Sequence, residues 1–88
     1  MTGTAVSTIT VRVLLFASYA DLLGLESLEL IIENPATVED ALNHLRSLPG
    51  GKSLPPKPLC AVNLRHVPPT TTLSPGDELA ILPPLAGG

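Results

Sequence analysis

Length, composition and charge exclude several classes of protein. The chain has 88 residues, 44% of them hydrophobic, and only Phe16 and Tyr19 are aromatic, so we expect one domain with an aliphatic core. The formal net charge is -3 and the five Lys and Arg residues are scattered, which provides no basic stripe for nucleic acid and favours basic protein surfaces as partners.

The first predicted element is a β-strand over residues 9–16, ITVRVLLF. The alternate residues on one side of this strand are all aliphatic: Ile9, Val11, Val13 and Leu15. The following segment, ASYADLLG, contains helix formers and ends on Gly24, a residue suited to the left-handed position after a helix. We therefore expect one or two helical turns between the first strand and the second.

A second strand and the main helix are predicted next. Residues 27–32, SLELII, alternate in the same way, and the Asn34-Pro35 step ends the strand because proline cannot donate to a ladder. In TVEDALNHLRSL, residues 37–48, apolar side chains recur at helical spacing, and Thr37 with Asp40 three residues later predicts a capped helix start. Pro49 and two glycines end this helix.

The second half of the chain predicts a proline-rich loop and two further strands. LCAVN, residues 59–63, is read as a short strand that RHV continues past a turn, and PPTTTL as a return along the surface. A turn at residues 74–77 leads into a last strand, ELAILP. The order strand, strand, helix, strand, strand predicts an α+β, ubiquitin-like β-grasp fold, with a mixed sheet of four to five strands and one main helix across one face.

Three segments are expected along the chain: a flexible extension at 1–8, the folded domain at 9–82, and an extended tail at 83–88. The polar start has no basic region, and the longest apolar run near it is far too short to cross a bilayer. Cys60 is the only cysteine and cannot form an internal disulfide. These features favour an unprocessed cytoplasmic chain that does not associate with a membrane.

No catalytic or metal-binding motif is recognisable. His44 and His66 lack a matching carboxylate or thiol motif, and His44 falls on the polar side of the helix. Cys60 alternates inward with Val62, so we interpret it as a buried core residue. The CxxC and HxxxH patterns of metal sites are absent, and Gly50-Gly51 follows a helix, whereas a phosphate loop precedes one.

The end of the chain, LPPLAGG, is the remaining candidate site. Pro83 and Pro84 favour an extended backbone that leads away from the sheet, and Leu85 and Ala86 narrow towards Gly87 and Gly88. Two residues without a Cβ suit a narrow channel in a partner protein, although a Gly-Gly end is equally consistent with an ordinary frayed terminus.

Several motifs together resemble the small, MoaD-like subunit of molybdopterin synthase over nearly the whole chain after Thr8. They are LLFASYADLLG, TVEDAL, the AVN of the third strand and GDELAILPPLAGG. The GDE turn, the two prolines and the terminal Gly-Gly match the family pattern in order and spacing. Members of this family share the β-grasp fold.

The resemblance implies that an E1-like adenylyltransferase uses ATP to convert the Gly88 carboxylate into an acyl-adenylate, and that a sulfurtransferase supplies the sulfur of a thiocarboxylate. It further implies that the large subunit of molybdopterin synthase receives the tail in a heterotetramer, where the sulfur passes to cyclic pyranopterin monophosphate. Gly87 gives clearance for the tail. On this interpretation the chain binds no cofactor and is not an enzyme by itself, because its partners supply the catalytic residues.

The predicted strand register adds a partner-binding surface. Phe16 and Leu82 fall on the side of their strands away from the helix, and exposed apolar groups there indicate a docking patch together with residues 83–86. The resemblance supports contacts of Phe16 and Leu82 with the large subunit, whereas His66 stands where many relatives have an apolar residue. Phe16 in the core, after a bend, is the alternative.

Two other functions share these features. Sulfur carriers for thiamine thiazole, cysteine or tRNA thiolation have the same fold and the same Gly-Gly end, and the Pro83-Pro84 step favours the molybdopterin pathway among them. A ubiquitin-like modifier or a docking module is the third interpretation.

Overall fold

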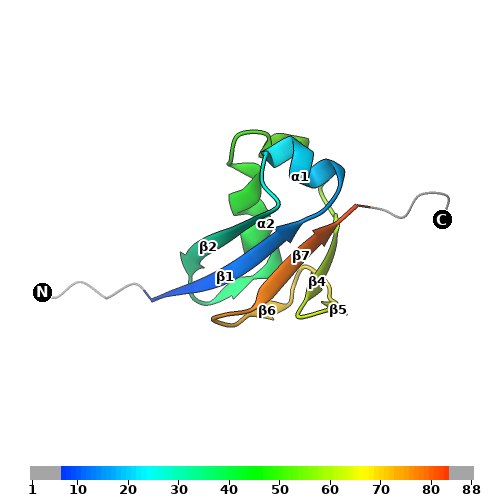
Figure 1. The fold of residues 1–88 in the computed structure, drawn as a ribbon. Helices are drawn as coiled ribbons and strands as arrows, with labels where there is room; N and C mark the ends of the chain where they lie inside the picture. Colours follow the sequence, from blue (N-terminus) through cyan, green and yellow to red (C-terminus); the bar gives the residue numbers. More distant parts are fainter. Residues whose placement is uncertain (1–6, 84–88) are drawn as a thin grey trace, which may run out of the picture.

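The sheet and helix of the predicted fold are both present (Figure 1). The computed structural model describes residues 7–83. Its elements in chain order are β1 (Thr8–Leu15), α1 (Ser18–Leu23), β2 (Ser27–Glu33), β3 (Ala36–Thr37), α2 (Val38–Arg46), the 3-10 turn η1 (Gly51–Ser53), β4 (Leu59–Val62), β5 (Arg65–His66), β6 (Thr72–Leu73) and β7 (Glu78–Leu82).

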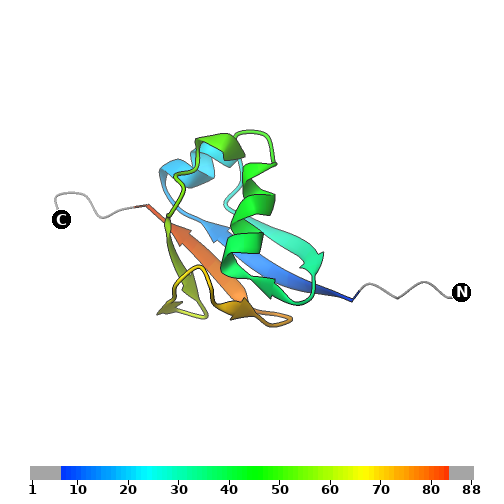
Figure 2. The same cartoon turned by 180° about the vertical axis from the view of Figure 1, so that it is seen from behind.

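Five strands form one mixed sheet in the order β2-β1-β7-β4-β5. The central pair, β1 and β7, is parallel, and the other neighbouring pairs are antiparallel. Helix α2 crosses one face of this sheet, as the view from behind shows (Figure 2). The arrangement confirms the predicted α+β class, with a mixed sheet and one main helix.

Helix α2 begins where the sequence predicts. The Asp40 amide donates to the Thr37 hydroxyl at 3.2 Å, and the Thr37 amide donates to the Asp40 carboxylate at 2.9 Å, which completes a capping box. The predicted range of 37–48 is too long at the other end. Ser47 and Leu48 each donate to the carbonyl three residues earlier, so the chain tightens out of α geometry before Pro49.

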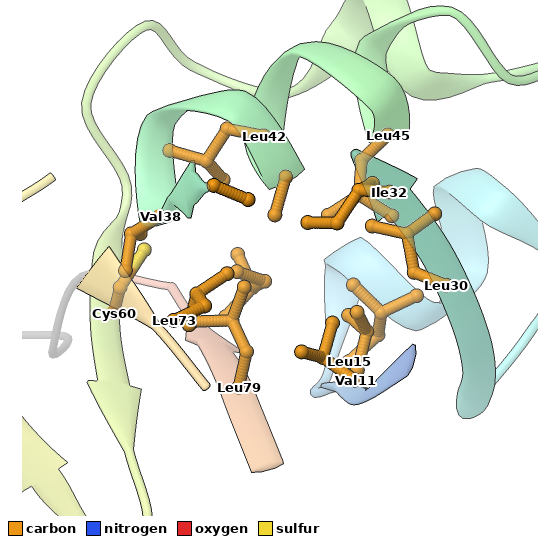
Figure 3. Close-up of a cluster of buried hydrophobic side chains, with 14 of the residues drawn as sticks. Val11, Leu15, Leu30, Ile32, Val38, Leu42, Leu45, Cys60, Leu73 and Leu79 are labelled. Atoms are coloured by element: carbon orange, nitrogen blue, oxygen red, sulfur yellow. The ribbon is translucent and has the colours of Figure 1, made fainter. Parts of the chain in front are cut away.

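An aliphatic core fills the space between α2 and the inner face of the sheet (Figure 3). Each fully buried aliphatic side chain contributes about 1.5–3 kcal/mol relative to an exposed one. Cys60 and Tyr19 belong to this core, whereas Phe16 does not. The largest side chains with almost no exposed surface are Leu42, Leu45, Leu73, Leu79, Ile81, Val11, Val13 and Val38.

The glycine pair after α2 has a packing role. A Cβ on Gly51 would collide with the Leu45 carbonyl oxygen, and one on Gly50, which has a positive φ of 85°, would collide with the Leu22 carbonyl oxygen. Gly50 therefore lets the turn after α2 approach the backbone of α1 closely, and Gly51 lets the same turn pack against the last turn of α2.

The prediction misses or misplaces the shortest strands. β3 and β6 pair only two residues each, so neither shows a period in the sequence. Residues 65–66 form the separate strand β5, which returns along β4 after a turn where Asn63 and Leu64 have positive φ. Thr8, the last residue of the predicted extension, is the first of β1, and residues 1–6 lie outside the described part.

Candidate functional site

The root of the predicted tail leaves the middle of the sheet. β7 lies between β1 and β4, with Ile81 opposite Leu15 on one side and Cys60 on the other. β7 ends at Leu82, and Pro83 follows as a half-buried residue. Pro84, Leu85, Ala86, Gly87 and Gly88 lie outside the described residues, so their predicted roles stay predictions.

Three large apolar side chains that are at least partly exposed lie at this root: Phe16, Leu59 and Leu82. Leu59 pairs directly with Leu82, both on the outer side, because their neighbours Cys60 and Ile81 point into the core. Phe16 directly follows Leu15, which is the last residue of β1 and the partner of Ile81, so Phe16 lies where β1 ends beside the end of β7. Phe16 is 44% exposed and Leu59 45% exposed.

We call this surface the outer apolar patch. It consists of Phe16, Leu59 and Leu82 together with Leu14 and Ala80, which pair with each other further along the sheet. The alternative of Phe16 in the core is thereby wrong, whereas Leu59 was not predicted as part of a site. The position of Leu59 could have been predicted from the sequence, because Cys60 was predicted to face inward and the preceding residue of a strand then faces outward. His66 pairs with Ala61 and lies exposed at the border of the same face.

A strained backbone turn directs Phe16 outward. Ala17 adopts φ 52° and ψ -126°, a conformation that residues with a Cβ rarely take. The chain thereby turns from β1 into α1, and the Tyr19 amide donates to the Phe16 carbonyl at 3.1 Å. Tyr19 is then buried while Phe16 remains at the surface.

The GDE and AVN motifs form a polar clamp at the start of β7. The Asn63 amide side chain donates to an Asp77 carboxylate oxygen at 3.0 Å, and the Glu78 amide donates back to the Asn63 side-chain oxygen at 3.0 Å. The other Asp77 oxygen accepts from the Ser74 amide at 2.7 Å. These residues fix the turn and the register of β7. A structural role is therefore enough to explain Asp77 in the GDE motif and Asn63 in the AVN motif.

Among the described residues, the side chains of Cys60, His44 and His66 make no hydrogen bond to another reactive side chain. Cys60 is 4% exposed, and burial raises the pKa of its thiol to about 11 although the Arg46 guanidinium opposes this shift. The thiol is therefore neutral at physiological pH, as the core interpretation predicts. His44 and His66 are both exposed. Within residues 7–83, no three or more His, Cys, Asp or Glu side chains gather as a metal site.

Neither α-helix among the described residues is long and apolar enough to cross a membrane.

Comparison with known proteins gives a family and a fold. The model of the ThiS family matches residues 13–88 of this chain. Among curated proteins, the chain has no match.

Several solved structures share the architecture. The small archaeal modifier protein SAMP1 from Haloferax volcanii is 28% identical, with a TM-score of 0.78 over 90% of this chain and 99% of that one. A candidate molybdopterin converting factor subunit 1 from Pyrococcus furiosus is 23% identical, with a TM-score of 0.76 over 88% and 99%. A chain in the complex of subunits 1 and 2 of molybdopterin-converting factor from Helicobacter pylori is 22% identical, with a TM-score of 0.67 over 91% and 100%. The likenesses confirm the predicted ubiquitin-like β-grasp fold.

Proposed function

The chain belongs to the ThiS family, and on that premise we propose that it is a sulfur carrier whose Gly88 carboxylate is activated and loaded with sulfur. The observation that carries this proposal is that the family match extends through the Gly87-Gly88 end. The central position of β7 supports it, because the last residue of this strand, Leu82, belongs to the outer apolar patch.

The chemistry requires activation because a carboxylate is a poor electrophile. Attack of a Gly88 carboxylate oxygen on the α-phosphorus of ATP gives an acyl-adenylate and releases pyrophosphate. A sulfide-level sulfur nucleophile then attacks the carbonyl carbon, AMP leaves, and a thiocarboxylate remains. In the proposal an E1-like adenylyltransferase and a sulfurtransferase carry out these steps, and this chain contributes the acyl group alone.

We further propose molybdopterin synthase as the client. Sulfur would pass from Gly88 to cyclic pyranopterin monophosphate while the large subunit holds the tail and the outer apolar patch. Two structural relatives support this choice, since one is a candidate molybdopterin converting factor subunit 1 and the other is a chain in a complex of subunits 1 and 2 of that factor.

Intact-protein mass spectrometry tests the carrier function. Incubation with the activating enzyme of the same organism, ATP and a sulfur source should add about 16 Da, the mass change when sulfur replaces one carboxylate oxygen. Removal of Gly88, or one residue appended after it, should abolish this gain. The same variants should keep the circular dichroism spectrum and the melting temperature, because the tail follows the last core residue of β7. An extended variant that gains sulfur without trimming contradicts the proposal.

A second function is favoured by the likeness to small archaeal modifier protein 1. In that case the activated Gly88 carboxyl would form an amide with a lysine of another protein, and AMP would leave. Incubation with ATP and an extract of the same organism separates the two functions. A modifier gives conjugates of higher mass that resist reduction, whereas a carrier gives the thiocarboxylate alone.

A further inference from the structure

A groove borders the outer apolar patch where β1 passes into α1. Its volume is about 550 Å³. Two carboxylates, Asp21 and Glu26, lie beside apolar walls that are formed by Leu14, Leu15, Phe16, Ala17 and Ala20. No basic side chain is among the lining residues within 7–83.

The groove is continuous with the root of the tail. Its wall residues Phe16 and Leu14 belong to the outer apolar patch, and Leu14 pairs with Ala80 of β7, two residues before Leu82. A protein that covers the outer apolar patch in order to reach the tail therefore also covers the groove. The position makes it part of a docking surface rather than a separate binding site.

Charge complementarity identifies the occupant. Asp21 and Glu26 are exposed and oppose any anion, while the apolar walls suit an aliphatic stem. Arginine meets both conditions, since its stem packs on alanine and leucine and its planar guanidinium stacks on a phenylalanine ring while it donates to carboxylates. Lysine has a more strongly hydrated point charge and suits the aromatic wall less well.

We propose that this groove receives an arginine side chain from the activating enzyme when that enzyme binds the tail, an inference that rests on the proposed carrier function. The opposite flank of the patch is lined by basic rather than acidic side chains. There, Lys57 and His66 line a second hollow beside Leu59. A partner with an arginine on one side and an acidic group on the other docks in one orientation only. A purely apolar patch would let the partner bind in several orientations.

The first test uses small probes and does not depend on sulfur transfer. Propylguanidinium and the neutral, similarly shaped propylurea are titrated into the protein, and amide chemical shifts are followed by NMR. We expect shifts confined to residues around Phe16, Ala17 and Ala20, with propylguanidinium bound about fivefold more tightly. Equal affinities, or shifts spread over the whole surface, overturn the proposal.

A matched pair of variants isolates the charge of the groove. Asp21→Asn with Glu26→Gln should remove the preference for propylguanidinium, whereas Glu33→Gln with Glu39→Gln, which makes the same change of net charge away from the groove, should retain it. Retention of the preference in the first variant contradicts the assignment.

The second test measures adenylation by the activating enzyme at low ionic strength. The groove variant should lower kcat/KM about fivefold or more with little change in kcat, and the control variant less than about twofold, with the difference shrinking in high salt. Equal kcat/KM for the groove variant and the wild type overturns the inference. A wild-type protein that gains no sulfur overturns the carrier function instead, and the probe titration still decides whether the groove binds a guanidinium.

Discussion

The two faces of the sheet differ although the same strands form them. On the inner face, Val11, Val13 and Leu79 have no exposed surface, and their packing against α2 explains why they are aliphatic. On the outer face, Phe16 and Leu59 are nearly half exposed, and the fold gives no reason for apolar side chains there. Apolar residues on the inner face are therefore explained by stability, whereas those on the outer face are the ones that we propose for partner binding.

The largest expected effect separates two leucines of the same strand. Leu79→Ala should lower the free energy of unfolding by about 2–5 kcal/mol, because it opens a cavity under α2. Leu82→Ala should lower it by less than about 1 kcal/mol, since Leu82 is only half-buried on the outer face. Urea denaturation of both variants measures the difference, and similar losses would show that the outer face also contributes to the core.

Charged residues extend this comparison to binding. Phe16→Asp and Leu82→Asp should leave the protein folded but weaken its association with the large subunit, because each places a carboxylate in the outer apolar patch. Calorimetric titration measures the affinity, and circular dichroism checks the fold. Unfolding of both variants would instead show that Phe16 and Leu82 contribute to the core.

An intermediate effect is expected at the clamp that holds the start of β7. Asp77→Ala removes the acceptor for the Ser74 amide and the Asn63 side chain, so it should lower the free energy of unfolding by about 1–2 kcal/mol. Asn63→Ala disrupts the same clamp, and in a double-mutant cycle the two losses should therefore be less than additive. Full additivity would mean that the two residues act independently.

The sequence predicts the regular parts of the fold because their signals are local. Alternation identifies β1 and β7, and the Thr37–Asp40 capping box identifies the start of α2. The pairing of β3 with β6 depends on segments more than thirty positions apart, and two residues carry no period.

The candidate site was predictable only in part. Strand parity places Phe16 and Leu82 outward, and the same rule applied to Cys60 would have found Leu59. The groove could not be predicted, because Asp21 and Glu26 line one hollow only after the chain turns at Ala17. An alanine in a sequence gives no sign that it adopts a positive φ.

The smallest predicted effect concerns that turn. At φ 52° and ψ -126° the Cβ of Ala17 is unfavourable, and such strain costs about 1–3 kcal/mol. Ala17→Gly removes the strain but gives the unfolded chain more freedom, which offsets about 0.5–1 kcal/mol. With a strain of roughly 1.5 kcal/mol, within that range, the net result should be a small gain in the free energy of unfolding, on the order of 0.5–1 kcal/mol.

Ala20→Gly is the matched control, because Ala20 lies inside α1 and packs against the core. It should lower the free energy of unfolding by about 1 kcal/mol, the ordinary effect of glycine in a helix. The two alanine-to-glycine changes, three residues apart, should thus have opposite signs in urea denaturation. Equal losses would mean that the turn at Ala17 is not strained. A stabilised Ala17→Gly variant that also binds the partner more weakly would indicate that the strained alanine holds Phe16 in place for docking, since glycine allows the turn other conformations.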